Sequence, residues 1–523
     1  MGVNRVPSVA LLGAALLSAA CAAGGGEQRE SDRSREIVID TDSAKPIDRR
    51  LFGTNVPAWL GPDTLADPAF RAATAALGTT LLRFPGGSWS NGYDWLACER
   101  AVEPDCFATW AARPSDFVGF MQATRLPGVW TTSFSGTAEE AAAAVAFFNG
   151  DVDDDRALGV DREGRDWRTV GEWARLRVAG GHPQPAQIEL WEVGNEVYGA
   201  RPAAGPNCAE FGWEDVWTCD GTQYVQGDDA HDGYLEYRDE MRTVDPGIEV
   251  GAVGLFDGES WGSWGTEVIA GAGDQLDFYV IHHYGFGGEP DGGTALAVPN
   301  QAWPELMQVA TETLAAENPS RAVPIAITEY NMVAFQDGDI NALMARAINM
   351  LYIADTIGQM AEHGVTIANQ WNLANGKAPN GTDYGLIDAD TGTRNPQYYA
   401  LALWTRFGDE LLATEVGFDT DDELSAYAGR AADGTVSVLA INKTGESTTA
   451  RLRIGSGAAG YTARADVVAA DSLEATTVEF NGSADPSVDL TDPPATELGD
   501  VGPEFDVTFE PYSVTLLRLS PVD

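Results

Sequence analysis

The chain has 523 residues, 44% of them hydrophobic, and a formal net charge of −47. The length exceeds one ordinary core, so we expect at least two domains, and the hydrophobic content is that of a folded globular protein. The excess of acidic groups leaves no basic patch for phosphates, which excludes nucleic acid as a partner and disfavours an anionic polymer as the main ligand.

Residues 1–21 are predicted to be a lipoprotein-type signal peptide. Arg5 is its positive region, residues 9–17 are apolar but too short to span a bilayer, and Ser-Ala-Ala-Cys at 18–21 resembles a lipoprotein cleavage box. Cys21 would then carry lipid, and residues 22–35 would form a flexible tether. A plain secretory peptide is the alternative. We expect an exported protein, anchored by lipid at the cell surface or membrane or otherwise secreted, with no other membrane contact.

The remaining cysteines fit an exported protein. Cys98 lies close to Cys106 in the sequence, and Cys208 lies close to Cys219. Two short-loop disulfides are the simplest pairing, although four cysteines allow three pairings. A zinc site is not expected, because no Cys-x-x-Cys motif occurs and the histidines are scattered apart from one adjacent pair.

Residues 36–407 alternate between strand-like and helical segments. After a short strand at 36–41, the runs predicted as strands are 51–56, 80–84, 127–134, 188–193, 248–255, 278–284, 324–330 and 366–372. The helical segments between them include 138–148, 169–178, 233–244, 304–316 and 340–363. Eight β-then-α units predict an α/β fold, the (β/α)8 TIM barrel.

Residues 408–523 lack helical periodicity. The short strands predicted here are 424–429, 435–442, 448–454, 463–469, 477–480, 505–509 and 514–519, with a polar loop at 484–500. This pattern predicts a C-terminal antiparallel β-sandwich. The first strand, 36–41, is a candidate to join it, because it precedes the first barrel strand and needs a partner edge.

Two glutamates end strands of the predicted barrel: Glu196 follows the fourth run and Glu329 the seventh. Active sites of TIM barrels lie at the carboxyl ends of the strands. Two carboxyls about 5–5.5 Å apart suit cleavage of a glycosidic bond by double displacement, with one protonated acid and one ionised nucleophile and no cofactor or metal. We expect the charge of Glu329 to hold the proton on Glu196. Glu192 shares a strand face with Glu196 and is expected to be structural, or to pair with an arginine.

Four segments resemble motifs of retaining glycoside hydrolases of clan A, most of all the α-L-arabinofuranosidases of family 51. They are Leu-Arg-Phe-Pro-Gly-Gly at 82–87, Gly-Asn-Glu at 194–196, Thr-Glu-Tyr-Asn at 328–331 and Phe-Glu-Pro-Tyr-Ser-Val at 509–514. The resemblance covers nearly everything after residue 36. It implies that Glu196 is the acid/base and Glu329 the nucleophile.

The resemblance also implies substrate-binding residues. Asn195 would hold the sugar 2-hydroxyl, Arg83 and Tyr284 would surround the nucleophile, and Trp371 would form an aromatic floor. His282 and His283 point to opposite sides of an extended strand, so one faces the site; we expect it to be His283. Tryptophans in predicted loops suit either packing or stacking on sugars, and the loop 208–219 after the acid/base strand is a candidate wall of the site.

The leading hypothesis is therefore a retaining O-glycosyl hydrolase that releases terminal α-L-arabinofuranosyl units from an oligo- or polysaccharide. Another clan A activity is the alternative: β-xylosidase, β-glucuronidase, galactofuranosidase or endoglucanase. A third hypothesis is a surface polysaccharide-binding lipoprotein that keeps the barrel without catalysis. Loss of one of the two glutamates would favour that third hypothesis, and both are present.

Overall fold

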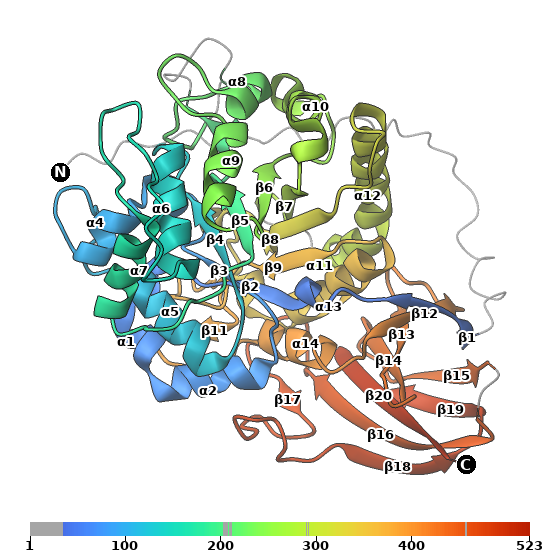
Figure 1. Cartoon of the computed structure of the whole chain (residues 1–523). Helices are drawn as coiled ribbons and strands as arrows, with labels where there is room; N and C mark the ends of the chain where they lie inside the picture. Colours follow the sequence, from blue (N-terminus) through green and yellow to red (C-terminus); the bar gives the residue numbers. More distant parts are fainter. Residues whose placement is uncertain are drawn as a thin grey trace.

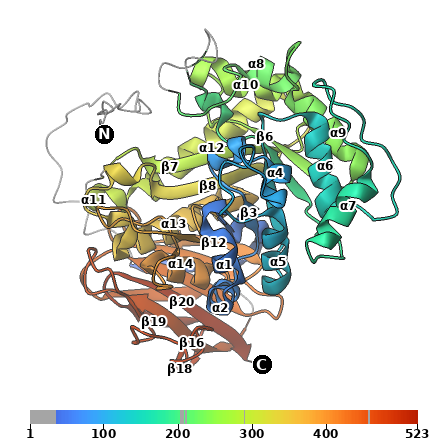
Figure 2. The same ribbon diagram turned by 90° about the vertical axis from the view of Figure 1, so that its left-hand side faces the viewer.

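The computed structural model describes residues 35–201, 208, 212–288, 290, 292–455 and 458–522. They form a closed barrel of parallel strands surrounded by helices, with a large sheet packed on one side (Figures 1 and 2). The predicted signal peptide with Cys21, and the tether up to residue 34, lie outside the described residues.

All eight runs predicted as barrel strands form the barrel, in the predicted order. The strands are β2 (Gly53–Asn55), β3 (Leu82–Phe84), β4 (Gly128–Thr132), β5 (Leu190–Val193), β6 (Glu249–Val253), β7 (Phe278–Phe286), β8 (Ile325–Val333) and β9 (Ile367–Gln370). Each pairs in parallel with its neighbour, and β2 closes the barrel on β9. β4 and β5 are buried throughout, as expected for strands covered on both faces.

Helices cover the outside of the barrel (Figure 1). They are α1 (Gly61–Ala66), α2 (Pro68–Leu77), α3 (Trp89–Gly92), α4 (Trp95–Arg100), α5 (Pro114–Thr124), α6 (Ala138–Asn149), α7 (Val170–Ala179), α8 (Gly221–Gln226), α9 (Tyr234–Val244), α10 (Ser260–Ala272), α11 (Gly292–Ala295), α12 (Val298–Glu317), α13 (Ala347–Glu362) and α14 (Pro396–Trp404). Short 3₁₀ helices cover Arg49–Phe52, Ala58–Leu60, Val197–Gly199, Gly273–Gln275, Gln336–Gly338 and Leu343–Ala345.

Helix ends follow local sequence signals. The Asp67 carboxylate accepts hydrogen bonds from the first free N–H groups of α2, at 2.7 Å from Ala69 N and 2.8 Å from Phe70 N. Gly78 ends the same helix in the left-handed region, with φ 75°. Thr137 caps α6 in the same way as Asp67 caps α2. Local sequence signals therefore set the start of α2 and of α6.

The C-terminal strands form one ten-stranded sheet. They are β1 (Glu36–Pro46), β12 (Glu410–Val416), β13 (Leu424–Arg430), β14 (Val436–Asn442), β15 (Thr448–Ile454), β16 (Gly460–Ala469), β17 (Glu479–Phe480), β18 (Thr496–Val501), β19 (Glu504–Phe509) and β20 (Ser513–Val522). Two further short strands, β10 (Ala374–Asn375) and β11 (Ile387–Asp388), pair with each other. β1 lies between β12, to which it is antiparallel, and β15, to which it is parallel.

The predicted sandwich is thus one continuous sheet that packs on itself. The sheet is antiparallel except for the β1–β15 pair. Leu452 of β15 and Leu517 of β20, far apart in strand order, belong to one buried apolar cluster. α13 and α14 lie between this sheet and the barrel strands (Figure 2).

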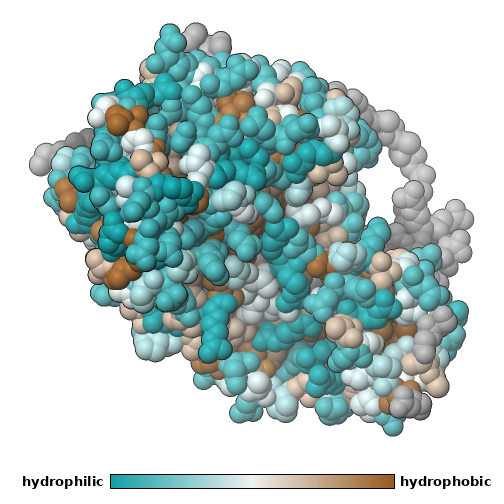
Figure 3. Space-filling view, in the orientation of Figure 1, coloured by the Kyte–Doolittle hydropathy of each residue, from teal (hydrophilic) through white to brown (hydrophobic). Residues whose placement is uncertain are grey.

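Both predicted disulfides are present, Cys98–Cys106 and Cys208–Cys219. The surface seen in Figure 3 is largely hydrophilic with scattered apolar residues, in keeping with the acidic composition. Within the residues that the structure describes, no helix combines the length and the apolar character needed to cross a bilayer.

Candidate active site

Glu196 and Glu329 meet at the carboxyl end of the barrel. Glu196 follows β5 and Glu329 lies in β8. A carboxylate oxygen of each, together with a ring nitrogen of His282, lies within 4.8 Å of the others. This separation is close to that of the two carboxyls of a retaining glycosidase, about 5–5.5 Å.

Both oxygens of Glu329 accept a hydrogen bond. Arg83 Nη1 donates to Oε1 at 2.9 Å, and the Tyr284 hydroxyl donates to Oε2 at 2.9 Å. Burial and the charge of Glu329 raise the pKa of Tyr284 well above its usual value, so its hydroxyl stays protonated. A cation and a neutral donor therefore bind both oxygens of the Glu329 carboxylate and hold it in one orientation.

Arg83 is fully buried and organises the site through all its nitrogens. Nε donates to Glu192 Oε2 at 2.6 Å, Nη2 to Asn195 Oδ1 at 2.9 Å, and Nη1 to Asn55 Oδ1 as well as to Glu329. Burial lowers the pKa of Arg83, but the charges of Glu192 and Glu329 outweigh burial and raise it. The predicted pairing of Glu192 with an arginine is confirmed: Glu192 is the second carboxylate of this ion pair, one layer below Glu196.

The backbone of Glu196 is left-handed, with φ 46° and ψ 33°. That region is uncommon for residues other than glycine and tends to occur where surrounding structure fixes a functional side chain. The preceding Gly194 also has positive φ, so β5 ends abruptly and the Glu196 side chain turns into the barrel mouth. His282 Nδ1 lies 2.9 Å from Glu196 Oε1, and Trp213 Nε1 donates to Oε2 at 2.8 Å.

His282, and not His283, lies between the two glutamates. The register of β7 against β8 shifts between Ile281 and His282, which places His282 opposite Glu329. The prediction that His283 faces the site is wrong: its ring packs against Phe256 and Trp303, with centroids 5.5 and 5.0 Å away. Burial lowers the pKa of His283 to about 4, so it is neutral.

The charge of His282 determines the state of Glu196. Burial lowers the pKa of His282, but the nearby carboxylates of Glu329 and Glu196 outweigh burial and raise it. Burial raises the pKa of Glu196, but the hydrogen bond and charge of His282 and the Trp213 N–H outweigh burial and lower it. These directions oppose the expectation that Glu329 keeps the proton on Glu196, because they favour ionised Glu196 beside protonated His282 in the resting site.

Asn195 lies in a network that includes a carboxyl group missed by the sequence analysis. Its side-chain nitrogen lies 3.4 Å from Glu214 Oε1, and Glu214 also accepts from Ser88 Oγ at 2.6 Å and from Asn91 Nδ2 at 2.9 Å. Burial and the charge of Glu196 raise the pKa of Glu214 to about 7. Glu214 and Trp213 belong to the loop that the Cys208–Cys219 disulfide closes, and this disulfide was the available sequence signal for their role.

Trp371, which was predicted to form an aromatic floor, follows β9 at the same end of the barrel. Its ring covers Gly86 and Gly87, in the turn after the strand that carries Arg83. Both glycines have positive φ, and a Cβ on Gly87 would lie 2.6 Å from the Trp371 ring. Only glycine allows this turn to pass so close beneath the indole.

Glu196, His282 and Glu329 form a group that offers three possible metal ligands. However, all four carboxylate oxygens already accept a hydrogen bond, from His282, Trp213, Arg83 and Tyr284. A metal ion would have to displace these donors and lie beside the Arg83 cation. The donor set therefore fits proton transfer better than metal binding.

Two known proteins with sequences similar to this chain are arabinofuranosidases. No protein-family model matches the chain. The chain is 25% identical over 210 residues to an intracellular exo-α-(1→5)-L-arabinofuranosidase of Halalkalibacterium halodurans, covering 39% of this chain and 36% of the relative. It is 23% identical over 286 residues to an exo-α-(1→6)-L-arabinofuranosidase of Bifidobacterium longum, covering 50% of this chain and 47% of the relative. The matches thus span between a third and a half of these relatives.

The fold comparison covers nearly the whole chain. A family 51 α-L-arabinofuranosidase from Thermotoga petrophila superposes with a TM-score of 0.66 at 19% identity, over 92% of this chain and 99% of that chain. The fold is thus that of glycoside hydrolases with a TIM barrel and a C-terminal antiparallel sheet. Within that class, the solved structures that the chain resembles include family 51 α-L-arabinofuranosidases.

Proposed function

We propose that the protein is a retaining glycoside hydrolase that releases terminal α-L-arabinofuranosyl units. The observation that carries the proposal is the meeting of Glu196 and Glu329, whose oxygens lie within 4.8 Å of each other and of a nitrogen of His282. The similarity to arabinofuranosidases supports the choice of sugar.

Glu329 is the nucleophile in this proposal. Arg83 and Tyr284 bind its carboxylate and orient one oxygen toward the anomeric carbon of a sugar bound over Trp371. Attack forms a glycosyl ester and removes the charge of Glu329. Asn195, fixed by Arg83 and Glu214, presents its amide to the sugar hydroxyl next to the reacting carbon.

Glu196 is the acid and then the base. The ion pair Glu196⁻–His282⁺ holds the same number of protons as Glu196–H beside neutral His282. Transfer of one proton from His282 to Glu196 across their 2.9 Å hydrogen bond therefore produces the acid form of Glu196. Glu196 passes that proton to the leaving oxygen. In the second step, ionised Glu196 removes a proton from the water that attacks the ester, and the site regains its starting proton count.

The assignment is tested with p-nitrophenyl α-L-arabinofuranoside. Glu329→Gln should remove nearly all turnover, and Glu196→Gln should lower kcat/KM by about 10²–10⁴-fold. Glu312→Gln, on the exposed surface of α12, is the control and should retain full activity. Azide should rescue Glu329→Ala with an inverted glycosyl azide and Glu196→Ala with a retained one, as read by NMR. Full activity in either glutamine variant ends the assignment.

A panel of other nitrophenyl glycosides tests the sugar separately. Turnover of a β-xyloside, β-glucuronide, galactofuranoside or cello-oligosaccharide in preference to the arabinofuranoside would keep the mechanism and change the substrate. Binding of a polysaccharide with no turnover of any member of the panel would favour the non-catalytic hypothesis.

We also propose that the protein is exported and carries lipid on Cys21. The two disulfides support an oxidising compartment. Cells fed a radiolabelled fatty acid should label the wild-type chain and not Cys21→Ala, which should leave the membrane fraction. Equal labelling of the two, or no labelling of the wild type, would refute the anchor.

A further inference from the structure

A continuous row of aromatic rings leads from the candidate site to the surface. Trp371 contacts Trp59, Trp59 contacts Trp89, and Trp89 contacts Trp110, with centroids 5.8, 5.3 and 5.6 Å apart. Phe107 also contacts Trp89, at 4.9 Å. We call these five residues the aromatic strip. Its inner end is Trp371, which covers the turn following Arg83.

The outer end of the strip is unusually exposed for large apolar side chains. Trp110 is 59% exposed and Phe107 is 51% exposed. Burial of these rings by something other than this chain would remove substantial apolar surface from water. Single exposed apolar residues are common, but here the exposed rings continue a row that begins at the candidate active site.

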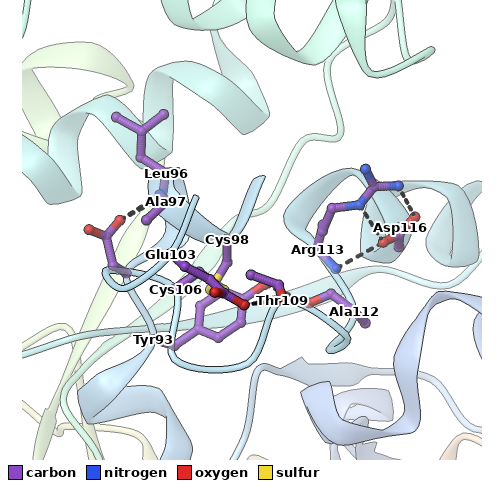
Figure 4. Close-up of a disulfide and its surroundings, with 11 residues drawn as sticks. Tyr93, Leu96, Ala97, Cys98, Glu103, Cys106, Thr109, Ala112, Arg113 and Asp116 are labelled. Atoms are coloured by element: carbon purple, nitrogen blue, oxygen red, sulfur yellow. Dashed lines mark hydrogen bonds and ion pairs between the residues drawn. A yellow bond between two sulfur atoms is a disulfide. The ribbon is translucent and has the colours of Figure 1, made fainter. Parts of the chain in front are cut away.

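The segment that carries Phe107 and Trp110 is held in place (Figure 4). The Cys98–Cys106 disulfide closes its first half, and the Tyr93 hydroxyl donates to the Ala112 carbonyl at 2.6 Å where it ends. Thr109 donates to Glu103 across the loop. The rings are therefore presented by a fixed loop, which lowers the entropy cost of binding a ligand on them.

We propose that the aromatic strip binds the neutral glycan chain to which the released sugar is attached, with Phe107 and Trp110 as its outer contacts. This inference rests on the proposed function. Aromatic faces pack on the C–H faces of sugars, and the row gives a chain an apolar path out of the site. The exposed acidic residues Glu103 and Asp105 on the same loop, in a chain of net charge −47, disfavour an anionic polymer.

The test compares a long and a short substrate. The long one is a linear α-(1→5)-arabinohexaose, and the short one is p-nitrophenyl α-L-arabinofuranoside, which reaches only the inner end of the strip. In Trp110→Ala, the ratio of kcat/KM for the hexaose to kcat/KM for the aryl glycoside should fall roughly tenfold, about 1.4 kcal/mol. Phe107→Ala should act in the same direction, and Trp110→Phe should restore most of the ratio.

The control is Val160→Ala, because Val160 is also 59% exposed but lies on the connection between α6 and α7. It should leave the ratio unchanged. Calorimetry with the Glu329→Gln enzyme should show the same tenfold loss of hexaose affinity in Trp110→Ala. An unchanged ratio and affinity in both Phe107→Ala and Trp110→Ala overturn the proposal.

Two further measurements separate this inference from its alternatives. If the wild type binds the hexaose through Trp110 but hydrolyses none of the substrates, the proposed function is wrong, while the proposal that the aromatic strip binds a glycan chain is supported. If sedimentation shows a dimer that Trp110→Ala dissociates, while hexaose affinity is unaltered, a second copy covers these rings and the proposal is wrong.

Discussion

His282 lies between two carboxylates that need opposite protonation states during the proposed reaction. Its ring contacts Glu196 at 2.9 Å and lies 3.6 Å from Glu329. A cation at this position favours the ionised form of both, so the proton count of the site depends on His282 as much as on either glutamate. As the ester forms on Glu329, one of the charges that raise the pKa of His282 disappears, which favours transfer of the His282 proton through Glu196 to the leaving oxygen.

We predict that His282→Asn shifts the alkaline limb of the kcat/KM profile to lower pH. In the wild type the Glu196–His282 pair needs one proton and loses it with the raised pKa of His282. The amide cannot hold a proton, so in the variant the Glu196 carboxyl alone must keep it and ionises at lower pH. A shift of roughly one pH unit is expected.

The matched control is His283→Asn. Its histidine is neutral and faces Phe256 and Trp303, so its loss should not move the alkaline limb, whatever it does to stability. A His282→Asn enzyme whose alkaline limb coincides with that of the wild type would contradict the role given to His282.

The histidine pair shows what the sequence could and could not predict about the site. Strand ends and motif spacing were enough to bring Glu196, Glu329, Arg83, Asn195 and Tyr284 together. Alternation alone favours His282 over His283, since residues 282 and 284 share a face. Glu214 could not be located, because its position depends on the course of a loop and its partners Ser88 and Asn91 are far away in the sequence.

At the scale of elements, the loop closed by Cys208–Cys219 supplies two contacts to the site. Trp213 donates to Glu196, and Glu214 holds Asn195. The Cys98–Cys106 disulfide closes a loop of similar length that directly precedes Phe107 and Trp110 of the aromatic strip. In the two proposals, the disulfides therefore support different steps, proton transfer and binding of the glycan chain.

We predict that Cys208→Ser/Cys219→Ser lowers kcat for the aryl glycoside about five- to tenfold, since a net hydrogen bond is worth about 1 kcal/mol. Cys98→Ser/Cys106→Ser serves as the control: it opens a loop with a sequence separation of 8 rather than 11, at a similar stability cost of about 2–3 kcal/mol. It should reduce hexaose binding more than aryl-glycoside turnover. Equal loss of kcat in both double variants would mean that each disulfide affects activity only through the overall stability of the protein.

Among the elements, the strands of the barrel were predictable because parallel strands are buried and read as apolar runs. β18 was not: its residues are exposed almost throughout, and it lies within the segment predicted to be a polar loop. α13 begins at Ala347 and not at 340, because a 3₁₀ helix at Leu343–Ala345 precedes it. The single self-packed sheet also could not be predicted, since local patterns do not specify which strands pair.

At the scale of the whole molecule, one buried ion pair joins the sheet to the barrel. Lys443, one of three lysines in the chain, follows β14 and contacts Asp355 of α13 at 2.6 Å, with both side chains 1% exposed. The same ammonium donates to the Leu296 carbonyl before α12, and Asp355 accepts from the Tyr427 hydroxyl of β13 at 2.6 Å. The pair therefore fixes how the sheet sits against α13.

We predict that Lys443→Met destabilises the protein by about 3–5 kcal/mol, because it leaves the Asp355 carboxylate buried without its cation. The double variant Lys443→Met/Asp355→Asn should recover most of that loss, since a neutral amide keeps the Tyr427 hydrogen bond and needs no counter-charge. Guanidinium unfolding followed by tryptophan fluorescence measures both. A single variant within about 1 kcal/mol of wild type, or a double variant no better than the single one, would show that Asp355 does not depend on Lys443 and that apolar packing alone holds the sheet to the barrel.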